Sequence, residues 1–379
     1  MAVTSRQVEP ARVAEPGEGI SLEELQLAGR NHAMPAEALR DELTPAGLHY
    51  VLCHYDIPAV DPDAWRLRLE GCVERPLELD LPALRSMPSR TVRVTMECAG
   101  NGRAALAPRP VSQPWLSGAV GTAEWTGVPL ADVLREAMPT SGAVEVAFTG
   151  ADHGFERGVE QDYERALPLG DAVGGDVLVA YEMNGAPLPV QHGFPARLVV
   201  PGWYGMAHVK WLVQVRVLDQ PYDGYQNAVA YRLRQEPEDP GDPVSRMEPR
   251  ALLLPPGDPD FLTRERILRP GPVTLSGRAW SGWGPVEAVA VSTDDGDTWV
   301  DAQVEVEVES AAEPEAGQDD HRWAWRRFTL AWDATPGTHV LRARATDSTG
   351  REQPIAPRWN LGGFANNADQ PVVVHVLEG

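Results

Sequence analysis

The stretch Thr95-Met96-Glu97-Cys98-Ala99-Gly100-Asn101-Gly102-Arg103 places a cysteine at the end of a predicted β-strand. Apolar residues alternate before the cysteine (Val92, Val94 and Met96), as they do in a half-buried strand. The Gly-Asn-Gly sequence that follows indicates a turn. A thiol held at the end of a strand, with a cation close behind it, suits a soft metal ligand better than a disulfide.

The composition limits what the rest of the chain can be. A chain of 379 residues is long enough for two domains. Its formal net charge of −22 excludes a general nucleic-acid binder, which needs a basic surface. The three cysteines, Cys53, Cys72 and Cys98, show no paired spacing. A zinc site or a disulfide framework is therefore not expected, and a reducing environment is the default.

The sequence shows no segment that addresses the chain to a membrane or to export. No apolar run approaches the roughly 20 residues of a membrane-spanning helix. The N-terminus has neither the apolar region of a signal peptide nor a twin-arginine pair. We therefore expect no membrane span and a cytoplasmic location, or a periplasmic one if a signal has been removed.

Basic side chains gather around two predicted consecutive strands, at 198–200 and 208–215. Alternation in the second strand places His208 and Lys210, the only lysine in the chain, on one face. With His192 and Arg197, these residues predict a cationic cluster. An anion is the simplest way to stabilise such a cluster.

Two loops add further polar side chains. The sequence Gly29-Arg30-Asn31-His32 follows a predicted helix that starts with the capping box of Ser21 and Glu24. A turn at 149–154 carries Asp152 after another predicted strand. Polar loops at the ends of regular elements are common places for binding sites, although a solvated turn is the more frequent outcome for a loop such as 29–32.

The composition changes beyond a segment at 235–260 that is dense in Pro, Asp and Glu. Six short β-prone segments between Val273 and Val376, rich in tryptophan, predict a β-sandwich. We therefore predict an α+β protein with three parts: a flexible tail at 1–20, a mixed α/β domain at 21–242 and an immunoglobulin-like sandwich at 243–379.

Several motifs, in order along the chain, resemble the sulfite oxidase family. They are the Thr95–Arg103 stretch, Arg30-Asn31-His32, Tyr181-Glu182-Met183-Asn184-Gly185, His192-Gly193-Phe194-Pro195, His208-Val209-Lys210-Trp211 and Pro357-Arg358-Trp359-Asn360-Leu361. The resemblance covers roughly residues 20–379. It implies a molybdopterin-dependent oxidoreductase of the bacterial sulfite oxidase or dehydrogenase type, without a haem domain. It further implies that the second domain pairs two chains into a homodimer.

The resemblance also assigns the cofactor site. Cys98 stands where the family holds one molybdenum per chain through a thiolate, a soft ligand for this metal. The remaining residues implied to hold the pterin and its phosphate are Arg30, Asn31, His32, Asp152, His192, Arg197, His208, Val209 and Lys210.

The substrate pocket is implied to contain Arg30, Arg103, Trp115 and Tyr231, with Tyr225 as the alternative tyrosine. Arginine side chains would bind a small oxyanion, and the tyrosine would donate a hydrogen bond to it or to the metal centre. The chain departs from the family pattern at Gly362, where sulfite oxidases have an arginine, and at Gly102. The loss of a guanidinium weakens the case for a doubly charged substrate.

The resemblance implies an enzyme that oxidises sulfite to sulfate by oxygen-atom transfer and passes the electrons to an external acceptor such as a cytochrome. One alternative keeps the cofactor and changes the substrate to a sulfoxide, nitrate or an organic sulfur compound. Another is a protein that binds the molybdenum cofactor without catalysis. Cys98, Arg103 and Tyr231 together favour an enzyme, because a carrier of the pterin does not need all three.

Overall fold

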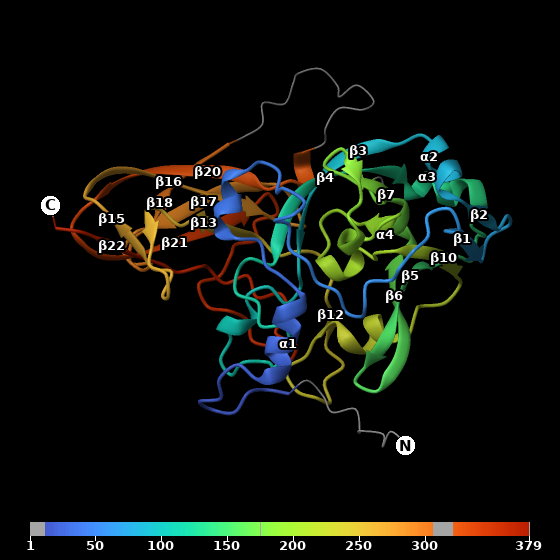
Figure 1. Cartoon of the computed structure of the whole chain (residues 1–379), viewed down its shortest axis with the longest axis horizontal. Helices are drawn as coiled ribbons and strands as arrows, with labels where there is room; N and C mark the ends of the chain where they lie inside the picture. The colour runs from blue at the N-terminus through green and yellow to red at the C-terminus, as the bar shows by residue number, and fades with distance from the viewer. Residues whose placement is uncertain (1–11, 175, 306–320, 379) are drawn as a thin grey trace.

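The computed structural model describes residues 12–174, 176–305 and 321–378. The chain forms two lobes, with the mixed α/β part at one end and the β-sandwich at the other (Figure 1). Residues 1–11 of the predicted tail lie outside the described residues. Residues 12–20 bond to the body of the protein: the Ala14 amide donates to Arg109 O at 2.8 Å, and the Val111 amide donates to Arg12 O at 2.8 Å.

The outer sheet of the α/β lobe is mixed. Its strand order is β2 (Leu77–Leu79), β1 (Leu67–Gly71), β10 (Leu212–Leu218), β5 (Glu145–Glu156) and β6 (Val159–Pro168). Strands β1 and β10 are parallel and the other pairs are antiparallel. Residues Val146, Phe148, Val215 and Val217 are buried because alternate side chains of β5 and β10 point into one core.

A second, antiparallel sheet carries the cysteine. Its order is β3 (Arg90–Glu97), β4 (Val120–Pro129), β7 (Leu178–Met183) and β8 (Ala186–Pro187), and β9 (Arg197–Val199) also pairs with β7. The alternating residues Val92, Val94 and Met96 of β3 are buried, as predicted. The strand ends one residue before Cys98, so the sheet fixes the position of the thiol.

Within the described residues, the α-helices that accompany these sheets are α1 (Leu22–Arg30), α2 (Leu81–Ser86), α3 (Leu130–Ala137) and α4 (Leu169–Val173). Helix α1 begins with the predicted capping box, in which Ser21 Oγ accepts from the Glu24 amide at 3.3 Å and Glu24 Oε2 accepts from the Ser21 amide at 2.9 Å. Short helical turns are η1 (Ala36–Arg40), η2 (Arg103–Ala105), η3 (Val190–His192), η4 (Gly205–Ala207), η5 (Gln226–Ala230) and η6 (His321–Trp323).

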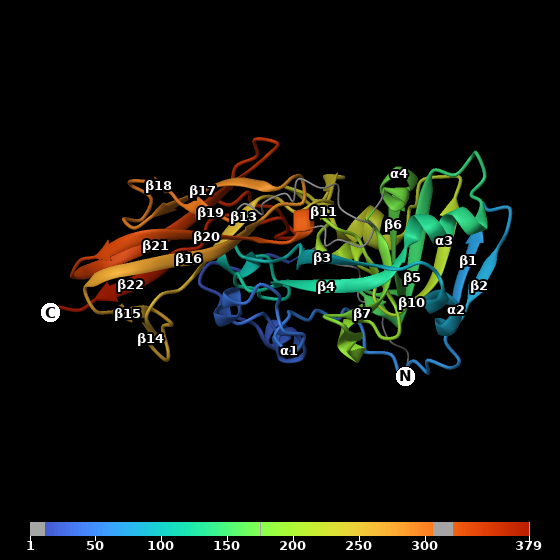
Figure 2. The ribbon, with the colours of Figure 1, turned by 90° about the horizontal axis from the view of Figure 1, so that it is seen from above.

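The C-terminal lobe is the predicted sandwich of two sheets (Figure 2). One sheet has the order β13 (Arg250–Leu254), β16 (Gly271–Trp280), β20 (Arg326–Ala334) and β19 (Gln303–Val304). The other has the order β14 (Asp258–Pro259), β15 (Arg266–Leu268), β22 (Val372–Val376), β21 (Gly337–Asp347), β17 (Val286–Ser292) and β18 (Val300–Asp301). A two-stranded ribbon, β11 (Arg232–Leu233) and β12 (Asp242–Pro243), precedes the sandwich.

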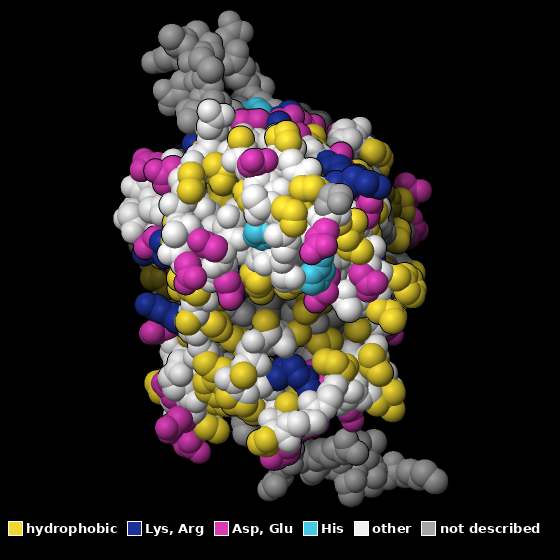
Figure 3. All heavy atoms as spheres, turned by 90° about the vertical axis from the view of Figure 1, so that its left-hand side faces the viewer, with side chains coloured by type: hydrophobic (Ala, Val, Ile, Leu, Met, Phe, Trp, Pro, Cys, Tyr) yellow, Lys and Arg dark blue, Asp and Glu magenta, His cyan; other side chains and the backbone are white. Residues whose placement is uncertain are grey.

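The inner faces of the two sandwich sheets form a separate apolar core, which includes Leu253, Phe328 and Leu341. Outside this core, acidic and hydrophobic side chains mix over the exposed end of the molecule (Figure 3). Acidic side chains outnumber basic ones on this face, in keeping with the net charge of −22. Among the described residues, no helix is long and apolar enough to cross a membrane.

The predicted strand at 208–215 is wrong in its first half. Strand β10 starts only at Leu212, and Trp211 has a φ of +48°. A positive φ breaks the extended conformation, so the period-two alternation does not apply to His208 and Lys210. The two side chains nevertheless meet around one cavity because the chain turns there.

Candidate functional site

Cys98 lies at the junction of two cavities. The turn after β3 is closed by the Asn101 amide, which donates to Cys98 O at 2.9 Å, and Gly102 adopts a φ of +85°. The Cys98 amide is itself held by Ala119 O at 2.9 Å. The side chain is buried, and burial raises the pKa of the Cys98 thiol while Arg103 acts in the opposite direction. The thiol is free, so its sulfur is available to a soft metal.

The inner cavity brings together most of the predicted cofactor residues. Asp152, His192, Arg197, His208 and Lys210 all line it with Cys98. Val209 is fully buried in the apolar core next to it and is not among the lining residues of the described chain. The predicted cluster therefore exists around one space.

Only part of that cluster is cationic. Burial lowers the pKa of His192 to about 2 and that of His208 to about 3, so both imidazoles are neutral at neutral pH. His208 is also bonded at both ring nitrogens, to the Val200 amide and to Trp203 O, each at 3.1 Å. Arg197 and Lys210 carry the positive charge of this cavity.

The two charged side chains of the inner cavity also support its walls. Arg197 donates to His192 O and His208 O, both at 3.0 Å, and its guanidinium lies over the Trp125 ring. Lys210 Nζ donates to Leu52 O at 2.9 Å and Gln191 O at 3.1 Å. Burial lowers the pKa of both groups, that of Arg197 to about 10. A bound phosphate would raise the pKa of both groups again, because a nearby negative charge favours their charged forms.

The inner cavity fits a polar cofactor. Asp152 Oδ1 is buried, and it has no hydrogen-bond partner among the described residues. Burial raises the pKa of Asp152 to about 7, which indicates a carboxyl group that lacks its donors. Buried polar atoms are normally satisfied, so this oxygen calls for a donor such as the amino group of a pterin. The donor set of Cys98, Asp152 and Lys210 thus matches a molybdopterin.

The outer cavity contains three of the predicted substrate residues, Arg103, Trp115 and Tyr231. Arg103 is held by two carbonyl groups: Nε donates to Gly362 O at 2.8 Å, and Nη1 donates to Gln113 O at 3.2 Å. Its guanidinium lies against Gly100, where a Cβ atom would come within 2.6 Å of it. Glycine at this position therefore permits the arginine to approach the turn that holds Cys98.

Tyr231 connects the two cavities. Its hydroxyl lies 2.8 Å from His54 Nε2, and Arg165 lies over its ring. Burial raises the pKa of Tyr231 well above its ordinary value and lowers that of His54, so the pair is a neutral phenol and a neutral imidazole. Tyr225 also lines the outer cavity, but only Tyr231 lines both.

The segment Arg30-Asn31-His32 is not among the described lining residues of the two cavities. Arg30 Nη2 donates to Tyr55 O at 2.5 Å, and His32 is exposed. Asn31 contributes indirectly, because its Oδ1 accepts a hydrogen bond from the Cys53 amide at 2.9 Å. It thereby supports the segment that does form the wall.

That wall is the segment 49–54, which sequence reasoning missed. His49, Tyr50, Leu52 and His54 line the inner cavity, and Leu52 and His54 also face the outer one. Two histidines within six residues of a mainly apolar stretch were the available signal. A hydrogen bond of 2.8 Å from His54 to a residue 177 positions away has no local signature in the sequence.

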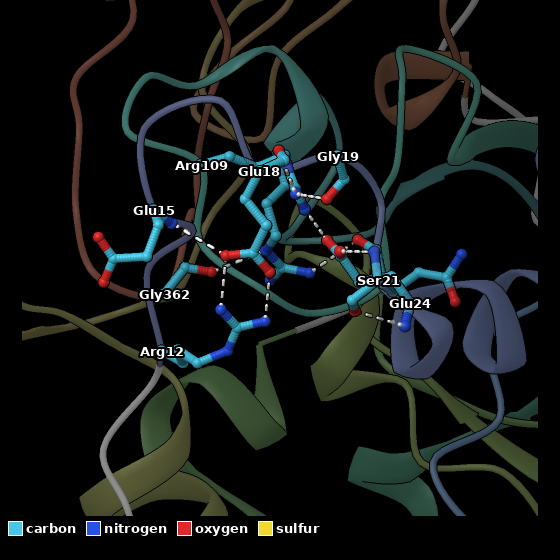
Figure 4. Close-up of polar contacts among 10 residues, drawn as sticks. Arg12, Glu15, Glu18, Gly19, Ser21, Glu24, Arg109 and Gly362 are labelled. Atoms are coloured by element: carbon cyan, nitrogen blue, oxygen red, sulfur yellow. Dashed lines mark hydrogen bonds and ion pairs between the residues drawn. The ribbon is translucent and has the colours of Figure 1, made fainter.

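The N-terminal segment and the sandwich complete the outer cavity. Arg109, from the loop that lines this cavity, pairs with the buried Glu24 of α1 and donates to Gly19 O at 2.7 Å (Figure 4). From the C-terminal lobe, Gly362 and Phe364 lie in its wall. Among the described residues, no group of three or more His, Cys, Asp or Glu side chains is placed to hold a metal ion.

Comparison with known proteins identifies the family of the chain. Residues 54–226 match the family model described as "Oxidoreductase molybdopterin binding domain", and residues 243–377 match "Mo-co oxidoreductase dimerisation domain". Sulfite oxidase of Gallus gallus is 38% identical over 365 residues, which cover 89% of this chain and 74% of that protein. The mitochondrial sulfite oxidase of Homo sapiens is 33% identical; the match covers 91% of this chain and 64% of the human one.

The fold agrees as well. The crystal structure of the sulfane dehydrogenase SoxCD from Paracoccus pantotrophus matches with a TM-score of 0.76 and 26% identity, covering 98% of this chain and 91% of that chain. The agreement extends over both lobes. This chain belongs to the sulfite oxidase family of molybdopterin-binding oxidoreductases.

Proposed function

We propose that the protein oxidises sulfite to sulfate by oxygen-atom transfer and passes two electrons to an external acceptor such as a cytochrome. One observation carries the proposal: the free thiol of Cys98 lies where a polar, buried cavity meets a second cavity that contains Arg103 and Trp115. The inner cavity suits a cofactor, and the outer cavity suits a small anion.

We propose one molybdenum per chain, with Cys98 as its protein ligand. When bound, the molybdopterin supplies a centre that exchanges electrons and an oxygen atom with the substrate. Asp152 would accept a hydrogen bond from the pterin, and Lys210 and Arg197 would offset the charge of its phosphate. His192 and His208 would shape the cavity as neutral rings.

The substrate would be oriented by the outer cavity. Arg103 offers its Nη2, which makes no hydrogen bond within the described chain, and Trp115 supplies a wall and an indole N–H. Tyr231 would donate to a substrate oxygen while His54 holds its hydroxyl in place. These residues bind and orient the anion and exclude water from it.

For the whole protein, we propose a homodimer formed through the C-terminal domain. The description of the family model for residues 243–377 as a dimerisation domain supports this. We propose a catalytic domain at 21–242 and a dimerisation domain at 243–379. Light scattering should return about twice the chain mass of 41.3 kDa, and a monomer that does not change with concentration would refute the dimer.

The function is tested by steady-state kinetics on purified, molybdenum-loaded protein with sulfite and ferricyanide. We expect sulfate to form as ferricyanide is reduced. Turnover of nitrate or a sulfoxide without sulfite turnover would replace the substrate and keep the cofactor. Protein that contains molybdenum and turns over none of these compounds would support the non-catalytic alternative.

A further inference from the structure

The outer cavity is wider and more apolar than a site for sulfite requires. Besides the segments around Leu52 and Cys98, its walls include side chains from α1, the loop at 110–115, the tip of the β5–β6 hairpin, η5 with the residues that follow it, and the C-terminal lobe. The apolar members that the argument uses are Leu27, Val111, Phe155, Val229, Leu361 and Phe364. Phe155 and Val229 stay 67% and 43% exposed, so the apolar surface reaches the rim.

The inner end of this cavity carries little positive charge. Arg103 is the only buried cation among the described lining residues. The other charged side chains that line the cavity are three arginines and two glutamates, so their charges nearly cancel. They are Arg157, Arg232, Arg234, Glu156 and Glu238. Leu52 and Gly362 face the same space as uncharged residues. One buried guanidinium matches one negative charge, because a second charge would stay uncompensated in a buried site.

Two hydrogen-bond donors at the inner end have no acceptor within the described residues. Arg103 Nη2 has no partner in the described chain, and the Trp115 indole N–H is buried without one. A buried donor without a partner calls for an acceptor on the ligand. The remainder of the ligand then meets the apolar walls.

We propose that this cavity takes an organic sulfinate, R–SO₂⁻, whose apolar substituent lies along the outer walls. A sulfinate keeps the pyramidal sulfur and the lone pair of sulfite and replaces one oxygen by carbon, so its charge falls from two to one. Its oxidation is balanced as R–SO₂⁻ + H₂O → R–SO₃⁻ + 2H⁺ + 2e⁻. One sulfur–oxygen bond forms, sulfur is oxidised, and the electrons go to the external acceptor. The oxidation of the sulfinate rests on the proposed oxygen-atom transfer. The binding of the organic anion in this cavity does not depend on it.

Binding separates the two proposals. Isothermal titration calorimetry on the holoenzyme should compare benzenesulfonate, which carries the charge and apolar ring of the product, with sulfate. We expect benzenesulfonate to bind at least about tenfold more tightly. Steady-state kinetics with benzenesulfinate and sulfite, each with ferricyanide, should show the higher kcat/KM for the sulfinate.

The variant V229E tests whether the apolar wall contributes to binding, and V144E is its control. Both positions hold valine with 43% exposure, but only Val229 lines the cavity. At physiological ionic strength, V229E should weaken benzenesulfonate binding about tenfold or more and leave sulfate within about twofold, because the carboxylate meets the apolar ring directly while salt screens its repulsion of an anion at the inner end. V144E should change neither.

Three results would overturn the proposal: sulfate bound as tightly as benzenesulfonate, equal effects of V229E on both anions, or the same loss in V144E. Tight benzenesulfonate binding without turnover of either sulfur compound would instead refute the proposed function and keep the binding site. The two failures are therefore distinguishable.

Discussion

The carboxylate of Glu97 accepts a hydrogen bond from the guanidinium of Arg250 at 2.8 Å, and this buried ion pair joins β3 to the first strand of the sandwich. The other carboxylate oxygen accepts from Trp280 Nε1 at 2.9 Å. Glu97 directly precedes Cys98 in the chain. The C-terminal lobe thus helps to hold the residue next to the proposed metal ligand, in addition to its proposed role in dimer formation.

Breaking this pair should be costly. The variant R250M leaves the Glu97 carboxylate buried without its partner, and we expect a loss of about 3–5 kcal/mol in the free energy of unfolding. R327M, which breaks an exposed pair with Glu305, is the control and should cost less than about 1 kcal/mol. Urea denaturation followed by tryptophan fluorescence measures both. Equal losses in the two variants would contradict this role of the buried pair.

Gly100 should be intolerant of a side chain because of Arg103. In G100A, the new Cβ would lie 2.6 Å from the guanidinium and would push it away from its position over the turn. We expect kcat/KM for sulfite to fall about 10- to 100-fold, the effect of one misplaced charged hydrogen bond of about 1.5–3 kcal/mol. Molybdenum content should stay unchanged. G142A, at a glycine with open space around it, is the control.

Asp152 predicts a pH dependence of stability in the cofactor-free protein. Burial raises the pKa of Asp152 from 3.8 to about 7, so the folded state binds a proton that the unfolded state has already released between these pH values. Stability should therefore be greatest below about pH 4 for this group and decline as pH rises to about 7, by at most about 4 kcal/mol. D152N should flatten this decline in thermal melts across the range, and an unchanged slope would contradict the assignment.

The N-terminal segment should be held by one buried contact. Glu24 is 1% exposed and is paired with Arg109, whereas the Arg12–Glu18 pair lies at the surface. R109M should therefore speed amide hydrogen exchange in α1 strongly, and R12M should change it little. Mass-spectrometric exchange measurements on peptides covering 22–30 decide between these outcomes. Similar exchange in R109M and the unaltered protein would show that other contacts hold the helix.

Local sequence patterns were sufficient for the centre of the site. The alternation before Cys98, the Gly-Asn-Gly turn and Arg103 are all neighbours in sequence, and the structure places them as the pattern predicts. The capping box of Ser21 and Glu24 is confirmed for the same reason, because both partners lie within one turn. The tryptophan-rich strands likewise form the predicted sandwich.

Features that depend on distant contacts were not accessible in this way. The positive φ of Trp211 displaces the start of β10, and nothing in the apolar alternation signals it. The segment 49–54 reaches the cavity through contacts such as His54 with Tyr231, and the histidine charges are set by burial. The predicted cluster is therefore in the right place, but its two histidines, His192 and His208, are neutral.

We propose Cys98 as the protein ligand of one molybdenum per chain. The most direct measurement is the molybdenum content per chain together with X-ray absorption at the molybdenum edge, for the unaltered protein, C98S and the control C72S. We predict about one molybdenum per chain in the unaltered protein and in C72S, and the loss of one sulfur neighbour or of the metal itself in C98S. Full metal content with an unchanged sulfur shell in C98S would contradict the account.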